Sequence, residues 1–176
     1  KEREEREIAG TSFEEGSQQS KKIWNTLWKL NIEHKIKVFI WKCINGTLPV
    51  REAIYKKASI GDPVCKGCGE DPETIEHTLL QCPLAKEVWE VAPITWDGAK
   101  NQIGSFQRWW SRITEAKIKQ EGKSHIDLTA NILWQIWKER NKRKFENQVS
   151  YQPCSVIQKA YKEWLELEEV ATKKID

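Results

Sequence analysis

The 176-residue sequence contains no methionine and no apolar run near the roughly 20 residues that a membrane-spanning helix requires. Its first residues lack the charged and then apolar leader of a secreted protein. We therefore expect a chain that resides inside the cell, in the nucleus or the cytoplasm, without a membrane partner. Because no initiator methionine is present, we also expect the chain to be either a trimmed protein or a piece of a longer one.

The sequence also lacks the strict apolar and polar alternation of a half-buried strand, and it has no internal repeat. Apolar residues instead recur at helical spacing almost throughout. Gly46 and Pro49 favour the end of one helix, and Pro83 favours the start of another. We predict an all-α fold, with helices at about residues 20–30, 36–44, 51–58, 83–89, 102–120, 126–147 and from Pro153 onward.

The net charge of +3 is too small to indicate a nucleic-acid partner by itself, but the charge is unevenly distributed. Residues 1–20 hold three basic and six acidic side chains and almost no apolar ones, which predicts a disordered acidic leader. Residues 21–57 contain nine Lys or Arg and two Glu, whereas residues 62–91 contain two Lys and seven acids. We expect a small domain over 21–91, followed by a helical extension over 92–176.

The most specific local pattern is C-x2-C-x8-H-x4-C, formed by Cys65, Cys68, His77 and Cys82. Two cysteines two residues apart on a tight turn can place both thiolates about 2.3 Å from one Zn²⁺, and His77 and Cys82 can complete a tetrahedron. Four protein ligands leave no position for a reactive water, so we predict a structural zinc ion that pins the small domain. Gly67 and Gly69 relieve the turn of Cβ clashes, so that the thiolates can converge.

Ordinary thiols that lie close together are the alternative to a zinc site. Four ligand-type side chains within 18 residues, in a stretch poor in apolar residues, argue against that alternative. Cys43 and Cys154 are better explained as buried thiols than as ligands. The acids around the cluster are interpreted as a solvated rim; they are Asp62, Glu70, Asp71, Glu73 and Glu76.

Seven short motifs occur in a defined order along the first half of the chain. They are Ile23-Trp24 with Leu27-Trp28, Lys35 to Lys42, Gly46 to Pro49, Cys65 with Cys68, Glu73 to His77, Cys82 and Trp89. The series resembles the zinc-binding domain that follows the reverse transcriptase in plant LINE-type (non-LTR) retrotransposons, and the match covers roughly residues 21–91. The resemblance implies a zinc module that helps to hold RNA template or target DNA beside a polymerase.

A second, shorter resemblance lies further along the chain. Residues Leu133 to Asn141 and Phe145 are similar to the helix that leads toward an RNase H-like domain in the same elements. The polymerase and endonuclease segments of a full element are missing from this sequence, and so are the strand-borne acids of RNase H chemistry. His34 and His125 have no nucleophile at a meaningful spacing, and no glycine-rich phosphate loop is present. We therefore expect no enzymatic activity.

Two classes of function stay open. Basic residues on the first two helices and on the long later helix favour salt-dependent binding of RNA or DNA. The candidate contacts are Lys29, Lys35, Lys37, Lys42, Lys138, Arg140, Lys142 and Arg143. The rival is a domesticated retrotransposon fragment that binds a protein or a small ligand, because ten tryptophans can exceed what a small core buries. Helical spacing of the tryptophans favours the core instead.

Overall fold

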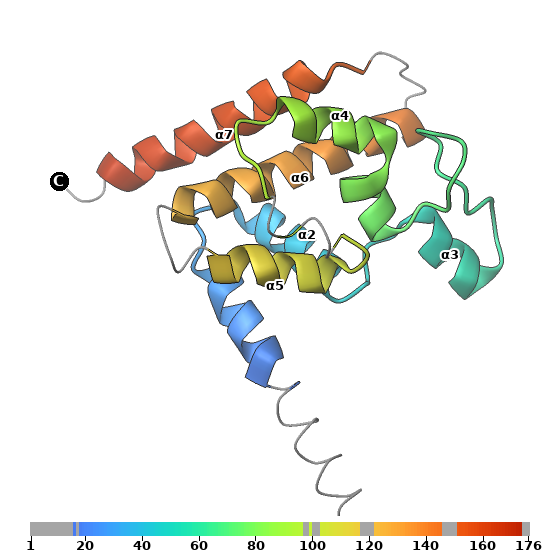
Figure 1. The fold of residues 1–176 in the computed structure, drawn as a ribbon, viewed down its shortest axis with the longest axis horizontal. Helices are drawn as coiled ribbons and strands as arrows, with labels where there is room; N and C mark the ends of the chain where they lie inside the picture. Colours follow the sequence, from blue (N-terminus) through green and yellow to red (C-terminus); the bar gives the residue numbers. More distant parts are fainter. Residues whose placement is uncertain are drawn as a thin grey trace, which may run out of the picture. The chain divides into compact units, whose positions relative to one another are not determined.

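The computed structural model describes residues 16, 18–96, 99, 103–116, 122–145 and 151–173. The chain divides into two compact units, Lys1–Leu30 and Asn31–Asp176. Within the described ranges every regular element is a helix, and the one isolated β-bridge joins Val64 to Pro72 (Figure 1). The predicted all-α fold is confirmed.

The first unit contains a helix at residues 18–28. The Thr26 hydroxyl donates a hydrogen bond to the carbonyl of Lys22, and the rings of Trp24 and Trp28 lie 4.9 Å apart. Residues 18–20 therefore belong to this helix and not to a disordered leader. The rest of the predicted leader, residues 1–15 and 17, lies outside the described residues.

Proline and glycine set several helix ends in the second unit. Helix α2 spans His34–Ile44, and Gly46 follows it with a φ of +67°, a left-handed conformation that favours glycine. Helix α3 spans Arg51–Ala58, and α4 spans Pro83–Val91 with its proline at the first position. The predicted bounds of α3 are confirmed, as is the predicted start of α4.

The later helices are α5 (Phe106–Ala116), α6 (Gly122–Phe145) and α7 (Pro153–Lys173). Helix α5 begins four residues later than the predicted 102–120, and residues 117–121 are outside the description. A short π-helix, η1, spans His77–Gln81 and was not predicted. No helix in the described part of the chain combines the length and the apolar character needed to cross a bilayer.

Helix α6 is the centre of the second unit. It contacts α2, α5, η1 and α7, and it runs beside α7 in Figure 1. Its middle is buried on all sides, which explains why even Thr129 and Gln135 have no exposed surface. The Phe39 ring of α2 packs 5.3 Å from the Trp134 ring of α6. This helix supplies the scaffold on which the zinc segment is built.

The ten tryptophans, all among the described residues, differ in how far they are buried. Trp109, Trp110 and Trp137 are buried, and the Trp109 ring lies 6.3 Å from the Trp89 ring. Trp24, with 38% of its surface exposed, is the most accessible of the ten. Three indoles therefore belong to the core, six are partly buried and Trp24 is exposed, so the prediction that their helical spacing places them in the core is confirmed only in part.

Candidate metal centre

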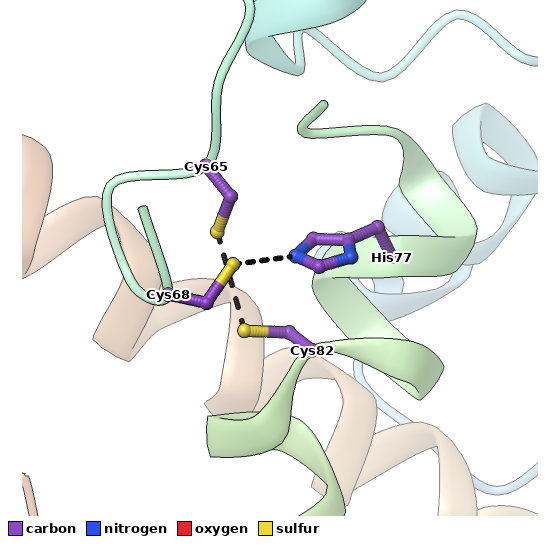
Figure 2. Close-up of side chains that lie close together, drawn as sticks. All are labelled: Cys65, Cys68, His77 and Cys82. Atoms are coloured by element: carbon purple, nitrogen blue, oxygen red, sulfur yellow. Dashed lines mark hydrogen bonds between the residues drawn. The ribbon is translucent and has the colours of Figure 1, made fainter. Parts of the chain in front are cut away.

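The four predicted zinc ligands converge in the structure. Cys65 and Cys68 lie in the loop between α3 and η1, whereas His77 begins η1 and Cys82 follows its end (Figure 2). Their ligand atoms all lie within 4.8 Å of one another. The Sγ atoms of Cys65 and Cys82 are 4.0 Å apart, and Cys68 Sγ is 3.4 Å from His77 Nε2.

These separations fit a tetrahedral zinc ion. Two sulfurs bound at about 2.3 Å to one Zn²⁺ lie about 3.8 Å apart, and a sulfur and an imidazole nitrogen lie about 3.5 Å apart. The two observed separations are within a few tenths of an ångström of those values. The cluster could therefore hold zinc with four protein donors, which fill its coordination sphere.

Two glycines shape the turn that carries the first two cysteines. Gly69 has a φ of +73°, and its N–H donates a 2.8 Å hydrogen bond to the Cys65 carbonyl. At Gly67 an added Cβ would lie only 2.9 Å from the Leu84 side chain. Gly69 is thus required by its backbone conformation and Gly67 by close packing, so both support the predicted role of glycine in this turn.

A shared hydrogen bond shifts the thiol pKa values of Cys65 and Cys82 in opposite directions. The hydrogen bond from the Cys82 thiol lowers the pKa of Cys65, and the backbone N–H groups of Cys68 and Gly67 lower it further against the effect of burial. The same bond raises the pKa of Cys82. Cys65 is therefore the first of the pair to become the thiolate that metal binding needs.

The π-helix explains the spacing of the last two donors. In an α-helix, residues five apart point about 140° away from each other. The N–H of Cys82 instead bonds to the His77 carbonyl at 2.7 Å, which closes the wider π-turn and brings both side chains to one side. The Trp89 indole N–H donates to the Leu79 carbonyl at 2.8 Å, so the tryptophan beyond the last cysteine supports this turn.

A backbone hydrogen bond and a nearby carboxylate orient His77. Its backbone N–H donates to the Thr74 hydroxyl at 2.9 Å, the pattern of an N-terminal helix cap. Its Nδ1 atom lies 3.9 Å from an Asp71 carboxylate oxygen, which favours the tautomer that presents Nε2 to the cysteines. Asp71 remains exposed, as a solvated rim requires.

Glu73 corrects the prediction of a wholly solvated rim. It is only 2% exposed and forms a buried ion pair with Arg140 of α6. It also accepts a 2.9 Å hydrogen bond from the backbone N–H of Arg51. Glu76 accepts one from the N–H of Phe106, the first residue of α5. These two carboxylates link the zinc segment to α3, α5 and α6, and no local sequence signal distinguished them from the exposed acids.

The two remaining cysteines differ from each other. Cys43 is buried, and its burial raises the pKa of its thiol well above the ordinary value. Cys154 is exposed near the start of α7, so the prediction that it is buried was wrong. The first turn of that helix presents this position to solvent.

The predicted nucleic-acid contacts on the first helices stay largely accessible. Lys42 is exposed in the last turn of α2, and Lys35 is exposed while paired with Glu33 at 2.7 Å. Lys37 is half-buried on the same helix, and Lys29 is exposed in the first unit.

The predicted contacts on α6 have different surroundings. Lys138 pairs with Glu163 at 3.4 Å, and Lys142 pairs with Glu139 at 3.0 Å. Arg140 is 5% exposed and forms an ion pair with Glu73, so its role is structural. Arg143 instead lines a narrow pocket beside Cys65 and Cys82. Sequence reasoning missed that Arg51 and Lys66 line the same pocket.

Comparison with known proteins agrees with the geometry. The chain is 25% identical over 147 residues to an Arabidopsis thaliana protein whose name describes it as a ribonuclease H protein. The aligned part covers 81% of this chain and 22% of that relative, so the chain spans about a fifth of its length. No solved structure matches. Residues 11–89 match the family described as zinc-binding in reverse transcriptase, and together with the four-donor cluster this match confirms the predicted zinc cofactor.

Proposed function

We propose that this chain is a non-catalytic, nucleic-acid-binding zinc module derived from the reverse transcriptase of a plant LINE-type retrotransposon. The observation that carries the proposal is the four-donor cluster of Cys65, Cys68, His77 and Cys82, in a segment that matches the zinc-binding family of reverse transcriptases. These four residues would hold the ion. Bound zinc would fix the loop and η1 in one arrangement and would keep neighbouring cations in place.

The donor set supports the proposed non-catalytic role of the metal. Three cysteines and one histidine complete a tetrahedral sphere, so no coordination position is left for a water nucleophile. His34 and His125 are both exposed, and neither belongs to the cluster. The module is therefore proposed to bind and position a nucleic acid.

Support for a nucleic-acid partner comes from the basic side chains. Lys35 and Lys42 are exposed on α2, and the last turn of α6 carries Lys142, Arg143 and Lys144 in succession. Such groups neutralise backbone phosphates and release counterions, which gives binding that depends on salt and little on sequence. The names of the matched family and of the relative both refer to proteins that act on nucleic acids.

The test is a salt series with the zinc-loaded chain and labelled single-stranded RNA or duplex DNA. We expect binding that weakens steeply with salt, and a triple change of Lys35, Lys37 and Lys42 to Gln that reduces the logarithmic salt slope by about two to three. A matched variant with Lys86, Lys162 and Lys173 changed to Gln removes the same charge elsewhere and should bind almost normally. Absence of binding at low salt would overturn the proposal.

A second candidate, a domesticated fragment that binds a protein, has one observation in its favour. Helix α7 exposes Tyr161, Leu165 and Val170, with 43%, 40% and 50% of their surfaces accessible. Exposed aromatic and aliphatic side chains on one helix are typical anchors of a protein interface. This candidate predicts that changing Tyr161 and Leu165 to Ser abolishes a partner's binding while nucleic-acid affinity stays absent or unchanged.

A further inference from the structure

A narrow pocket beside the zinc cluster gathers positive charge from three separate segments. Arg51 begins α3, Lys66 lies between the two cysteines of the turn, and Arg143 and Lys144 end α6. Glu73 and Arg140 also line the pocket, and so do Cys65 and Cys82. The space inside is small, about the size of one water molecule.

Ion pairs with carboxylates neutralise only part of the positive charge that lines the pocket. Arg140 is paired with Glu73, and Arg51 lies 3.6 Å from an Asp62 carboxylate oxygen. In the described ranges, Lys66, Arg143 and Lys144 form no ion pair with a carboxylate. A zinc ion with three thiolates and a neutral imidazole carries one negative charge, so the three cations exceed it by two.

Arg143 presents a donor that lacks an acceptor. Its Nη1 atom is buried and has no hydrogen-bond partner in the part of the chain that the structure describes. The guanidinium lies 5.1 Å from the centre of the Tyr151 ring, and the Tyr151 hydroxyl donates in turn to the Leu84 carbonyl. A buried guanidinium nitrogen without an acceptor is costly, so a ligand oxygen at this position would be stabilising.

We propose that this pocket is a phosphate site, in which Lys66, Arg143 and Lys144 bind one backbone phosphate of a nucleic acid at the pocket mouth. The inference rests on the proposed function and deepens it, since it names the group that is bound and the residues that bind it. One phosphate oxygen fits the narrow space, whereas a base does not. Charge-assisted hydrogen bonds from an arginine to a phosphate are among the strongest that proteins make.

The position of Lys66 couples the site to the metal. Lys66 lies on the turn between Cys65 and Cys68, and the Gly67 N–H bonds to the Cys65 sulfur at 3.3 Å. Zinc binding therefore fixes one of the three cations relative to the other two on α6. The pKa of Lys144 is lowered, by burial first and by the nearby Arg140 next, as expected where cations crowd together. The metal-loaded chain should bind phosphate more tightly than the metal-free chain.

The competing explanation is that these cations only balance the charge of the thiolates. The two explanations differ in what a charge-removing variant changes. If the cations serve the thiolates, then changing Arg143 and Lys144 to Gln weakens zinc binding and leaves RNA affinity of the zinc-saturated protein unchanged. If they serve a phosphate, the same variant weakens RNA binding at saturating zinc.

The experiment measures single-stranded RNA affinity of the zinc-saturated full chain, with zinc affinity followed by chelator competition. For Arg143→Gln with Lys144→Gln we expect RNA affinity to fall about tenfold and the logarithmic salt slope to fall by about one, because one phosphate contact is lost. The matched control, Lys159→Gln with Lys162→Gln, removes two cations of α7 that pair with Glu139 and Glu166, and it should change the affinity much less. Lys144→Gln alone guards against misfolding of the double variant and should show part of the loss.

Inorganic phosphate is the second probe, observed by NMR at the amides of Lys66 and Gly67 and at the Arg143 side chain. We expect these signals to shift in the zinc-loaded chain and RNA to displace the phosphate. Phosphate binding that RNA does not displace would assign the pocket to a small free anion and overturn the proposal. Wild-type RNA binding that the double variant retains would also overturn it, while leaving the proposed function intact. A wild-type chain that binds no RNA would contradict the proposed function itself.

Discussion

Two regions of the second unit are held together by different physical means. The interior between α2, α5 and α6 is apolar, and Ile36, Trp110 and Ile132 have no exposed surface there. In contrast, α3 has no buried residue, and the loop between it and η1 buries only Cys65, Glu73 and Ile75. The first region can therefore fold on hydrophobic burial alone, whereas the second depends on a metal and on polar contacts.

Removal of zinc should have the largest effect on the difference in stability between the two regions. We expect a chelator, or the change Cys68→Ser, to unfold residues 59–90, because structural zinc contributes about 10–16 kcal/mol of apparent binding free energy that is linked to folding. Hydrogen exchange should show lost protection in that segment and retained protection in α5 and α6. Native protection of residues 59–90 in the metal-free chain would show that their fold does not need the ion.

The buried ion pair should give the next largest effect, because it joins the two regions. Changing Arg140 to Met leaves the Glu73 carboxylate buried without its partner and should cost about 3–5 kcal/mol in the free energy of unfolding. The double variant that adds Glu73→Gln should recover part of this loss, since a neutral amide can still accept from the Arg51 N–H. Denaturant unfolding of the zinc-loaded protein measures both.

The matched control for the ion pair lies two residues away on the same helix. Lys138 pairs with Glu163 in a partly exposed position, so Lys138→Met should cost about 1 kcal/mol or less. Equal losses for Arg140→Met and Lys138→Met would mean that the buried pair does not hold the zinc segment on α6.

The sequence predicted features that neighbouring residues determine better than features that distant parts of the chain determine. Local signals decided the features that were predicted well. Pro83 and Pro153 begin their helices as expected, Gly46 follows α2, and the cysteine and histidine spacing selected the four residues that meet. The helix ends depend on neighbours within a turn or two of the chain, and the four metal-ligand candidates all lie within 18 residues.

Features that depend on distant parts of the chain were not predicted. Glu73 and Arg140 are 67 positions apart, so the sequence pattern gave no reason to separate Glu73 from the exposed acids around it. The pocket likewise combines residues of α3, the cysteine turn and α6. The π-turn at His77 was missed because helical periodicity does not distinguish one widened turn from an ordinary helix end.

The cap at Thr74 offers a smaller test within the zinc region. Changing Thr74 to Val removes the hydroxyl that accepts from the His77 N–H, and should cost about 1 kcal/mol. Because His77 is one of the four clustered donors, we expect the loss to appear as weaker zinc affinity. Thr74→Ser keeps the hydroxyl and should bind zinc normally. If both variants bind zinc equally well, the cap does not orient the histidine.

A pair of glycines gives the smallest and sharpest comparison of the two regions. Gly46 after α2 and Gly69 after the cysteine turn have φ values of +67° and +73°, and an added Cβ would meet no atom within 4 Å at either position. Alanine should therefore cost about 1–2 kcal/mol at both sites through backbone strain alone. At position 46 the cost should appear in the free energy of unfolding and leave zinc affinity unchanged. At position 69 the turn forms with the metal, so the same cost should weaken zinc binding by about five- to thirtyfold in a chelator competition. Equal effects of the two variants on zinc affinity would contradict the separation, because both regions would then fold as one metal-dependent unit.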